Sequence, residues 1–499
     1  MTDSFQPSRG VRQGDPLSPY LFVICMEQLA KAIDRRILDG QWKQIQLSRG
    51  GPGLSHLFFA DDLVLFTEAS LKQAKIVHEV LQDFCMSSGH RVSVSKTQIF
   101  FSNNCSLERK QSIANHFGFE IVDDLGKYLG VPLLHKRVTR ATYQYLIEKI
   151  DQRLSGWKAK SLALAGRITL AKAVLQAIPI YTMQTTWLPK GICDEIEKRI
   201  RRFVWGITPD HNAINLVKWD IVKKPSNMGG LGFRDVQNQN CAFLMKVGYH
   251  LVCSKDKLWV QVLRDKYKWI GELPSEIYRR NSSRLWQGVS HCWEAIKQSM
   301  CWQVRNGWKV DFWWDVWLDG REPLATKYLL PGDPPHVSVA SMLTVTGAWD
   351  WSKLALALPR ESLDQLASVV PPHAGFGNDS LVWRWTETRI FSTASAYRTL
   401  GPEVLLEEED SWKFIWRLPV PQRIRTFLWL LNHDRLMTNK ERTRRHFGNN
   451  SLCPVCGVED EDINHVLRTC SRTRQVWAKL VPPNLWRSLF NGNNRDWLQ

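Results

Sequence analysis

The sequence lacks several features that would assign it to a simple class of protein. No stretch approaches the roughly 18 consecutive apolar residues that a membrane-spanning helix needs. The amino terminus has no basic segment followed by an apolar one, so no secretory signal is expected. The 11 cysteines are odd in number and scattered, which argues against a secreted disulfide scaffold and favours a reducing, intracellular compartment. There is no solenoid-type repeat and no long low-complexity tract.

The composition that is present indicates a basic globular protein of several domains. At roughly 100–200 residues per domain, 499 residues predict three or four units. Lys and Arg number 66 against 49 Asp and Glu, a net charge of +17. This excess favours a polyanionic partner, of which nucleic acid is the commonest, over a basic protein with no such partner. Two stretches are locally basic, residues 151–205 and residues 412–480.

Two adjacent acids, Asp61 and Asp62, interrupt an apolar stretch. On a continuous strand neighbouring side chains point to opposite faces, so one of the two acids would be buried without a partner, at high cost. A tight hairpin turn at Asp61-Asp62, between strands at Leu57–Ala60 and Leu63–Phe66, removes the conflict. Two convergent carboxylates suit Mg²⁺ and two-metal phosphoryl transfer. An exposed acidic turn is the alternative.

About 50 residues upstream, residues 9–19 read RGVRQGDPLSP, a Gly/Pro turn that opens an apolar helix expected at Tyr20–Ala30. The free N–H groups at a helix start favour phosphate, and the side chains of Arg12 and Gln13 add donors. The alternative is a capped helix entry. Further apolar stripes at helical spacing predict helices at Leu71–Cys85, Ala141–Leu154, Ser161–Ala177 and Asp194–Trp205.

These motifs, in this order, resemble the reverse transcriptases of plant LINE-type non-LTR retrotransposons. The resemblance rests on RQGDPLSPYLF at 12–22, FADD at 59–62, SGHRVSVSKT at 88–97, KYLGVPL at 127–133 and GGLGF at 229–233. It runs from about residue 5 to the carboxyl terminus. His90 and Ser93 depart from the Leu and Asn usual in the family.

The resemblance implies roles for several residues. Asp61 and Asp62 would be the family's metal-binding hairpin and hold Mg²⁺. Gln13 and Gly14, with Arg12, would line the nucleotide and template site, and Lys96 would protonate pyrophosphate or hold a phosphate.

The implied fold class is α+β, with four segments. Residues 1–125 would form a partial right-hand polymerase palm, residues 126–255 a helical thumb-like connector, residues 256–405 a Trp-rich domain and residues 406–499 a small zinc-binding module. Nine of the 24 tryptophans fall in residues 259–317. We expect them to fill a core, because base stacking would need exposed rings.

A cysteine–histidine cluster predicts the zinc site. Cys453, Cys456, His465 and Cys470 have the spacing C-x2-C-x8-H-x4-C. Four such ligands satisfy tetrahedral Zn²⁺ and leave no open position for water, so the site is expected to be structural. Chance cysteines in a reduced core are the alternative. Cys241, Cys253, Cys292 and Cys301, with His250 and His291, lack ligand spacing and are expected in the core or on the surface.

Basic residues surround this cluster. Residues 421–450 contain seven Lys and Arg against two Asp and Glu, with Phe427 and Trp429 interleaved. We expect nucleic-acid contacts here, from Arg423, Arg425, Arg442, Arg444 and Arg445. A solvated charged face is the alternative.

The family's polymerase site needs a third carboxylate from a strand upstream of the RQGDPLSP turn. Only eight residues precede Arg9; Asp3 is too close to the turn, and Asp34 and Asp39 follow it. We therefore expect a remnant of an RNA-directed DNA polymerase, truncated at its amino terminus and inactive alone, that binds RNA and DNA in the nucleus rather than the cytoplasm. The alternatives are a non-catalytic, zinc-dependent nucleic-acid-binding protein derived from the element and a pseudogene product. The sequence does not fix an oligomeric state.

Overall fold

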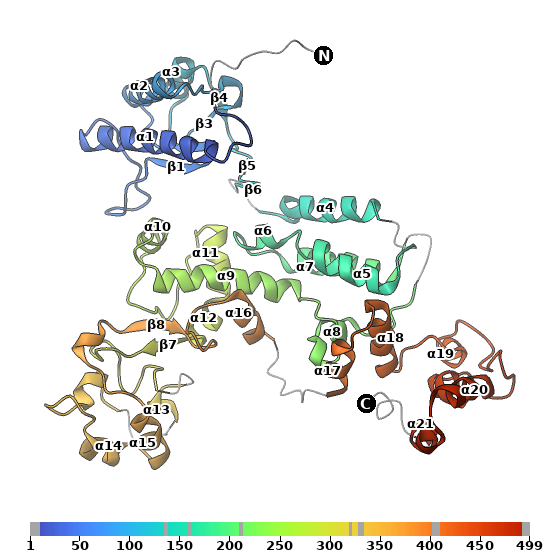
Figure 1. Cartoon of the computed structure of the whole chain (residues 1–499). Helices are drawn as coiled ribbons and strands as arrows, with labels where there is room; N and C mark the ends of the chain where they lie inside the picture. The colour runs from blue at the N-terminus through green and yellow to red at the C-terminus, as the bar shows by residue number, and fades with distance from the viewer. Residues whose placement is uncertain are drawn as a thin grey trace, which may run out of the picture. The chain divides into compact units, whose positions relative to one another are not determined.

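The computed structural model describes residues 10–133, 138–157, 161–208, 213–318, 322–327, 334–401 and 410–491 (Figure 1). Asp3 and Arg9 lie outside the described residues. By its internal contacts the chain divides into two compact units: unit 1 comprises Met1–Arg137 and His250–Ser282, and unit 2 comprises Val138–Tyr249 and Ser283–Gln499. Within the described ranges, no helix combines the length and the apolar character needed to cross a membrane.

Unit 1 combines helices with short two-stranded sheets. Its elements are α1 (Ser18–Leu38), β1 (His56–Phe59), β2 (Asp62–Leu65), α2 (Leu71–Ser88), β3 (Gln98–Phe100), α3 (Leu107–Phe117), β4 (Glu120–Val122), β5 (Lys127–Tyr128), β6 (Val131–Pro132) and α10 (Leu258–Lys266). β1 and β2 form an antiparallel hairpin, as do β5 and β6, whereas β3 and β4 are parallel with α3 between them. The expected mixture of helix and strand is confirmed here.

The core of unit 1 forms where α1 packs on α2. Leu29 and Ile33 of α1 are fully buried, and Val80 and Phe84 of α2 belong to the same cluster. The expected stripe on α2 is therefore confirmed. The indole of Trp42 joins this core and donates a hydrogen bond of 3.0 Å to the Phe66 carbonyl, which ties the segment after α1 to the end of the hairpin.

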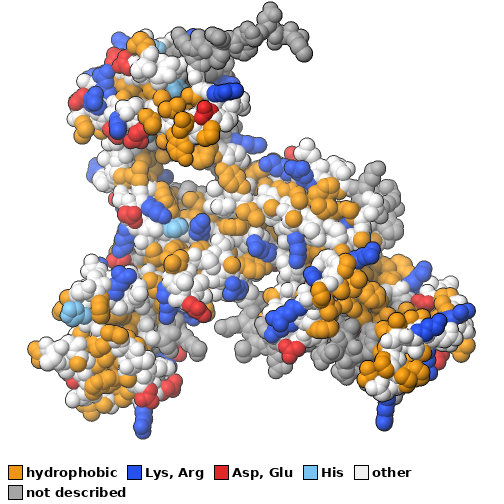
Figure 2. Space-filling model, viewed as in Figure 1, with side chains coloured by type: hydrophobic (Ala, Val, Ile, Leu, Met, Phe, Trp, Pro, Cys, Tyr) orange, Lys and Arg blue, Asp and Glu red, His pale blue; other side chains and the backbone are white. Residues whose placement is uncertain are grey.

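Hydrophobic side chains also lie on the surface of unit 1 (Figure 2). One group comes from the turn before α1, from the first turns of that helix and from the outer face of the hairpin. It comprises Leu17, Tyr20, Val23, Ile24 and Phe59, each at least 57% exposed. The first half of α1 is thus apolar on both of its faces, as the sequence indicated, and one face has no cover among the described residues.

Unit 2 is mostly helical. Its elements are α4 (Gln144–Ser155), α5 (Leu164–Leu170), α6 (Ile180–Met183), α7 (Lys190–Trp205), α8 (Trp219–Lys223), α11 (Arg284–His291), α12 (Trp293–Gln298), β7 (Met300–Gln303), α13 (Leu324–Lys327), α14 (Trp351–Ala357), α15 (Arg360–Ala367), β8 (Ser380–Trp383), α16 (Thr393–Thr399), α17 (Asp410–Arg417), α18 (Gln422–Asn432), α19 (Asn439–Arg444), α20 (Ser471–Leu480) and α21 (Trp486–Asn491). The long helix α9 (Val236–Cys253) crosses the unit boundary. The three helical stretches expected between residues 141 and 205 are confirmed, with a π-helical turn at Ala171–Leu175.

Helices α4 and α7 share one hydrophobic core with α17 and α18, which precede the zinc motif in the chain. Ile150 of α4, Ile196 of α7, Ile415 of α17 and Trp429 of α18 are all fully buried in a single cluster. Segments more than 200 residues apart in sequence therefore share one hydrophobic core. The division into four segments remains a prediction.

The GGLGF motif at residues 229–233 lies at this junction. The carbonyl oxygen of Gly229 accepts a hydrogen bond of 2.8 Å from the indole N–H of Trp429, and Nε2 of His433 lies 2.6 Å from it. Gly229 has a positive φ of 80°, and a Cβ there would lie 3.0 Å from the Trp412 ring. A Cβ on Gly230 would lie 1.8 Å from the Lys224 carbonyl oxygen. Only glycine permits this approach of backbone to backbone.

The expectation that the tryptophans of residues 259–317 fill the core holds for four of the nine. Trp286, Trp293, Trp313 and Trp317 are buried. Trp269 and Trp302 are half-buried, and Trp259, Trp308 and Trp314 are exposed, Trp308 to 71%. A second cluster in this region is built on Phe312, Trp313 and Trp317, and β7 pairs antiparallel with β8 beside it.

The glycine junction yields a stability prediction. We expect Gly230→Ala to lower the melting temperature of the full chain by roughly 3–4 °C, because the new methyl group must displace backbone at a cost of about 2–3 kcal/mol. Gly191→Ala is the matched control, since a Cβ there meets nothing within 4 Å. Differential scanning fluorimetry of the two variants measures the effect, and an unchanged melting temperature for Gly230→Ala would contradict the steric argument.

Candidate zinc and magnesium sites

The four residues of the cysteine–histidine motif come together in unit 2. The ligand atoms of Cys453, Cys456, His465 and Cys470 all lie within 4.8 Å of one another. Zn–S bonds of about 2.3 Å in a tetrahedron place sulfur atoms about 3.8 Å apart, so this cluster closes around Zn²⁺ with small movements. Three soft thiolates and one imidazole are the donors that Zn²⁺ prefers.

Local backbone structure sets the spacing of the ligands. Gly457, at a φ of 67°, turns the chain after Cys456, and its N–H donates to the Cys453 carbonyl over 2.8 Å. This knuckle holds the first two cysteines together. His465 begins a π-helical turn, His465–Thr469, which brings Cys470 back to the same side, and the Cys470 N–H donates to the His465 carbonyl. His465 and Cys470 thus lie at the two ends of one short turn.

The surroundings lower the pKa of two of the three cluster thiols. The backbone N–H groups of Glu459 and Val458 point at Cys456 and lower the pKa of its thiol to about 7. Burial raises the pKa of Cys470, but the N–H groups of Arg472 and Thr473 outweigh it and bring that pKa below its usual value. The backbone N–H of Cys456 lowers the pKa of the third, Cys453, but burial and the side chains of Cys456 and Cys470 outweigh it and raise that pKa. Thiolates are the form that binds metal.

Glu459 orients the histidine ligand. Its Oε2 lies 2.8 Å from Nδ1 of His465, while Nε2 of the same ring lies 3.3 Å from Cys456 Sγ. The carboxylate thereby fixes the ring with Nε2 toward the metal position, the usual arrangement for a metal-bound histidine. The sequence analysis did not name Glu459. An acid three residues after the second cysteine of a knuckle was the available signal.

The two acids lie on the β1–β2 hairpin, but the turn is one residue earlier than expected. Phe59 pairs with Asp62, so the two-residue loop is Ala60-Asp61 and Asp62 is the first residue of β2. The prediction of a turn at Asp61-Asp62 was wrong in register because Ala60 takes the left-handed conformation, with a φ of 50°. Both carboxylates are nevertheless exposed at the tip, where oxygen ligands can meet Mg²⁺.

No third ligand joins this pair in the described part of the chain. The only group of three or more His, Cys, Asp or Glu side chains close enough to share a metal ion there is the zinc cluster. Lys96, on a short 3-10 turn, is exposed and makes no side-chain hydrogen bond or ion pair with described residues.

The turn before α1 is built as the sequence indicated. Arg12, Gln13 and Gly14 are exposed, and Gly14 has a φ of 88°. The hydroxyl of Ser18 donates to the Arg12 carbonyl over 2.7 Å and closes the turn. The side chains of Arg12 and Gln13 stay directed to solvent, where a ligand can reach them.

The five arginines proposed for nucleic acid have different surroundings. Arg423 and Arg442 are exposed and make no ion pair with described residues. Arg444 is exposed but pairs with Glu441, and Arg444 and then Arg445 lower the pKa of that glutamate to about 2.

Two of the five are structural. Arg425 donates to the Leu418 carbonyl at the end of α17. Arg445 donates to the carbonyls of Asn215 and Leu216.

The two aromatic residues interleaved with these arginines differ in exposure. Trp429 is fully buried and its N–H donates to the Gly229 carbonyl, so its ring is not available to stack on a base. Phe427 is 42% exposed and can still do so. The four other cysteines lie where the sequence analysis put them: Cys241, Cys292 and Cys301 are buried, Cys253 is exposed, and none belongs to a ligand group within the described ranges.

Comparisons with known proteins match the two segments that carry these candidate sites. Residues 2–133 match the family of reverse transcriptases (RNA-dependent DNA polymerases), and residues 391–477 match the family described as zinc-binding in reverse transcriptase. A putative ribonuclease H protein of Arabidopsis thaliana is 32% identical over 378 residues, which cover 74% of this chain and 60% of that protein.

Two further relatives are products of mobile elements. An uncharacterized 149 kDa protein of transposon TX1 from Xenopus laevis is 21% identical over 95% of this chain and 41% of its own length. The Pol polyprotein of a type-2 retrotransposable element of Drosophila melanogaster is 34% identical over 95 residues, 19% of this chain and 8% of that protein. The matched part of the chain thus spans less than two thirds of the length of each of these relatives, between 8% and 60%.

The zinc cluster yields a direct prediction. Purified full-length protein should contain close to one equivalent of zinc by elemental mass spectrometry, and Cys453→Ser or Cys470→Ser should lose it. Cys253→Ser is the matched control, because that cysteine is exposed and outside the cluster. Protein that folds with no zinc, or that keeps its zinc in Cys470→Ser, would show that the four residues do not form the site.

Proposed function

We propose that this chain, which belongs to the reverse transcriptase family in residues 2–133 and to the zinc-binding family of reverse transcriptases in residues 391–477, binds RNA and DNA but does not extend a primer by itself. Its relatives are retrotransposon-related proteins, and the motif order is that of the non-LTR class. The reaction expected of a complete member of this family is RNA-directed DNA synthesis.

The observation that carries the proposal is the pair of acids at the hairpin tip, which no third metal-ligating side chain joins among the described residues. Asp61 and Asp62 would hold Mg²⁺, Arg12, Gln13 and Gly14 would face the incoming nucleotide and template, and Lys96 would meet a phosphate. Two-metal phosphoryl transfer holds its ions about 3.5–4 Å apart with bridging ligands. Two adjacent side chains on one turn fix such a pair poorly, and misplacement of about 1 Å can cost on the order of 100-fold in rate.

Binding needs no such alignment. The net charge of +17 attracts a polyanion. In the segment predicted to bind zinc, residues 406–499, Arg423 and Arg442 are exposed and have no ion-pair partner among the described residues. The partly exposed ring of Phe427 can stack on a base. A structural Zn²⁺ held by the four ligands would keep the segment that carries Arg442 in one conformation. These features support binding to a single strand with little sequence preference.

Primer extension on an RNA template with Mg²⁺ tests the proposal. We expect the full chain to make no more product than the Asp61→Ala/Asp62→Ala variant, because neither holds a complete metal site. In the same preparation, fluorescence anisotropy should show binding of labelled single-stranded RNA that weakens with salt, by roughly 0.7 log units per contacted phosphate for each tenfold rise.

The two halves can fail separately. Robust extension that disappears in Asp61→Ala would mean that another acid completes the site and would overturn the claim of inactivity. Absence of binding at low salt, in protein that retains its zinc, would overturn the claim of nucleic-acid binding.

A further inference from the structure

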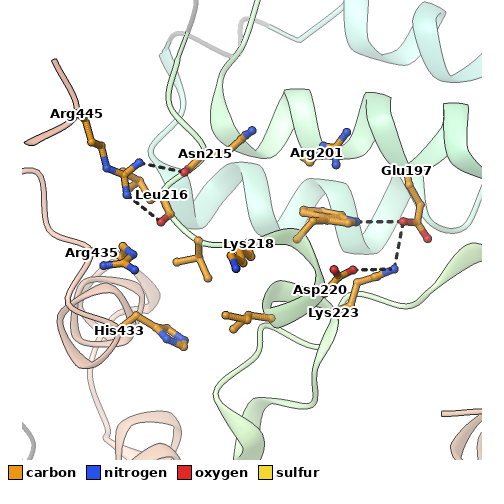
Figure 3. Close-up of a pocket in the computed structure, with 13 residues that line it drawn as sticks. Glu197, Arg201, Asn215, Leu216, Lys218, Asp220, Lys223, His433, Arg435 and Arg445 are labelled. Atoms are coloured by element: carbon orange, nitrogen blue, oxygen red, sulfur yellow. Dashed lines mark hydrogen bonds and ion pairs between the residues drawn. The ribbon is translucent and has the colours of Figure 1, made fainter. Parts of the chain in front are cut away.

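A cavity of about 780 Å³ lies within unit 2, between the segment Asn215–Lys223 with helix α7 on one side and residues 433–445 on the other (Figure 3). None of its lining residues other than Arg445 was singled out as a site residue by the sequence. Its volume is that of a small-ligand site, large enough for one or two nucleotide units and too small for a duplex.

The charges that line the cavity are unequal and separated. Five are cationic, from Arg201, Lys218, Lys223, Arg435 and Arg445, against the two acids Glu197 and Asp220. Both acids pair with Lys223, at 3.5 and 3.6 Å. In Figure 3 this group lies on the other side of the cavity from Arg435 and Arg445, with Lys218 between the two sides and Arg201 on the side of Glu197.

The acids are further occupied by the protein itself. Glu197 also accepts hydrogen bonds from the Trp219 indole, over 3.2 Å, and from the Val236 N–H, over 3.0 Å. Lys223 in turn makes a shorter ion pair of 2.9 Å with Asp235. Glu197 is therefore held in a structural network, whereas the Asp220 side chain is 92% exposed beside Lys223. The side of Arg435 and Arg445 carries the excess of positive charge.

Arg445 builds the wall of that positive end. Its guanidinium donates to the carbonyls of Asn215 and Leu216, over 3.3 and 3.4 Å, and pairs with Glu441 at 2.6 Å. Three of its five N–H groups are thus engaged, and the side chain holds the two sides of the cavity together.

Three other cations that line the cavity do not hold its two sides together. Arg201, Lys218 and Arg435 make no ion pair with any described residue; Arg435 donates only to the neighbouring Asp434 carbonyl. Arg201 and Arg435 are half-buried, which strengthens their pull on an anion that enters the cavity, and Lys218 is exposed at the rim.

We propose that this cavity binds the sugar–phosphate backbone of a single nucleic-acid strand, with Arg201, Lys218 and Arg435 contacting phosphates. The inference rests on the proposed function and adds a site to it. Guanidinium groups bind phosphate oxygens in pairs, and Trp219 lines the same cavity as an aromatic surface for a base or sugar. This aromatic wall favours nucleic acid over an acidic polypeptide.

The test compares two double variants of the zinc-loaded full chain that remove the same charge. Lys218→Gln/Arg435→Gln removes two cavity cations. Arg360→Gln/Arg398→Gln is the control, because both arginines are exposed, lie outside the cavity and make no ion pair with described residues. Zinc content and melting temperature confirm that each variant is folded.

Binding of a labelled single-stranded 12-mer is then measured at several salt concentrations. We expect the cavity variant to bind roughly tenfold more weakly at 0.1 M salt and its salt slope to flatten by about 1.4. The control should change affinity by less than about twofold. A thiouridine-containing strand should also crosslink to peptides from residues 213–224 or 433–445 of the parent protein.

Three results would overturn the inference. If the parent chain binds and the cavity variant matches the control, the cavity is not the site, while the proposed function stands. If the parent chain does not bind at all, both fail. If the cavity variant loses affinity for poly-glutamate but not for the oligonucleotide, the occupant is an acidic polypeptide and the assignment to nucleic acid is wrong.

Discussion

The carbonyl oxygen of Gly229 is the point on which unit 2 depends most. Trp429 and His433, at the end of α18, both bind it, and they reach it only because Gly229 and Gly230 carry no side chain. The contact sets α17 and α18 into the core made by α4 and α7. From there the chain leads through α19 to the zinc ligands, so the connector and the start of the zinc-bearing segment fold around one shared interior.

Two functional features follow from that arrangement. Because α18 is fixed, His433 and Arg435 come to lie opposite Lys218, and the cavity between them exists only while both halves are in place. Arg445 closes the same junction from α19 by binding two backbone carbonyls. The cysteine–histidine cluster follows this junction in the chain. Its four residues lie within 18 consecutive residues, and Glu459 orients the histidine. Tertiary packing therefore places the cations of the cavity, whereas local turns place the four residues of the cysteine–histidine cluster.

The same contrast explains what the sequence could predict. The zinc ligands and the acidic hairpin were predictable because each is local: ligand spacing or alternation of apolar residues determines it. The predicted hairpin turn was one residue too late. Asp adopts the left-handed conformation more readily than Ala, so nothing in the sequence indicated that Ala60 would occupy that position. The roles of Arg425, Arg445 and Trp429 were not predictable. Arg445 bonds to a carbonyl 230 positions away, and a basic residue that serves packing has the same local pattern as one that serves a ligand.

The most direct test of the shared interior is native-state hydrogen exchange of the full chain, followed by mass spectrometry across a denaturant series. If connector and zinc-bearing segment share one cooperative core, peptides covering Lys190–Trp205 and Gln422–Asn432 should open with the same free energy and the same denaturant dependence. Exchange of Gln422–Asn432 through a separate opening of lower free energy, while Lys190–Trp205 stays protected, would contradict this account.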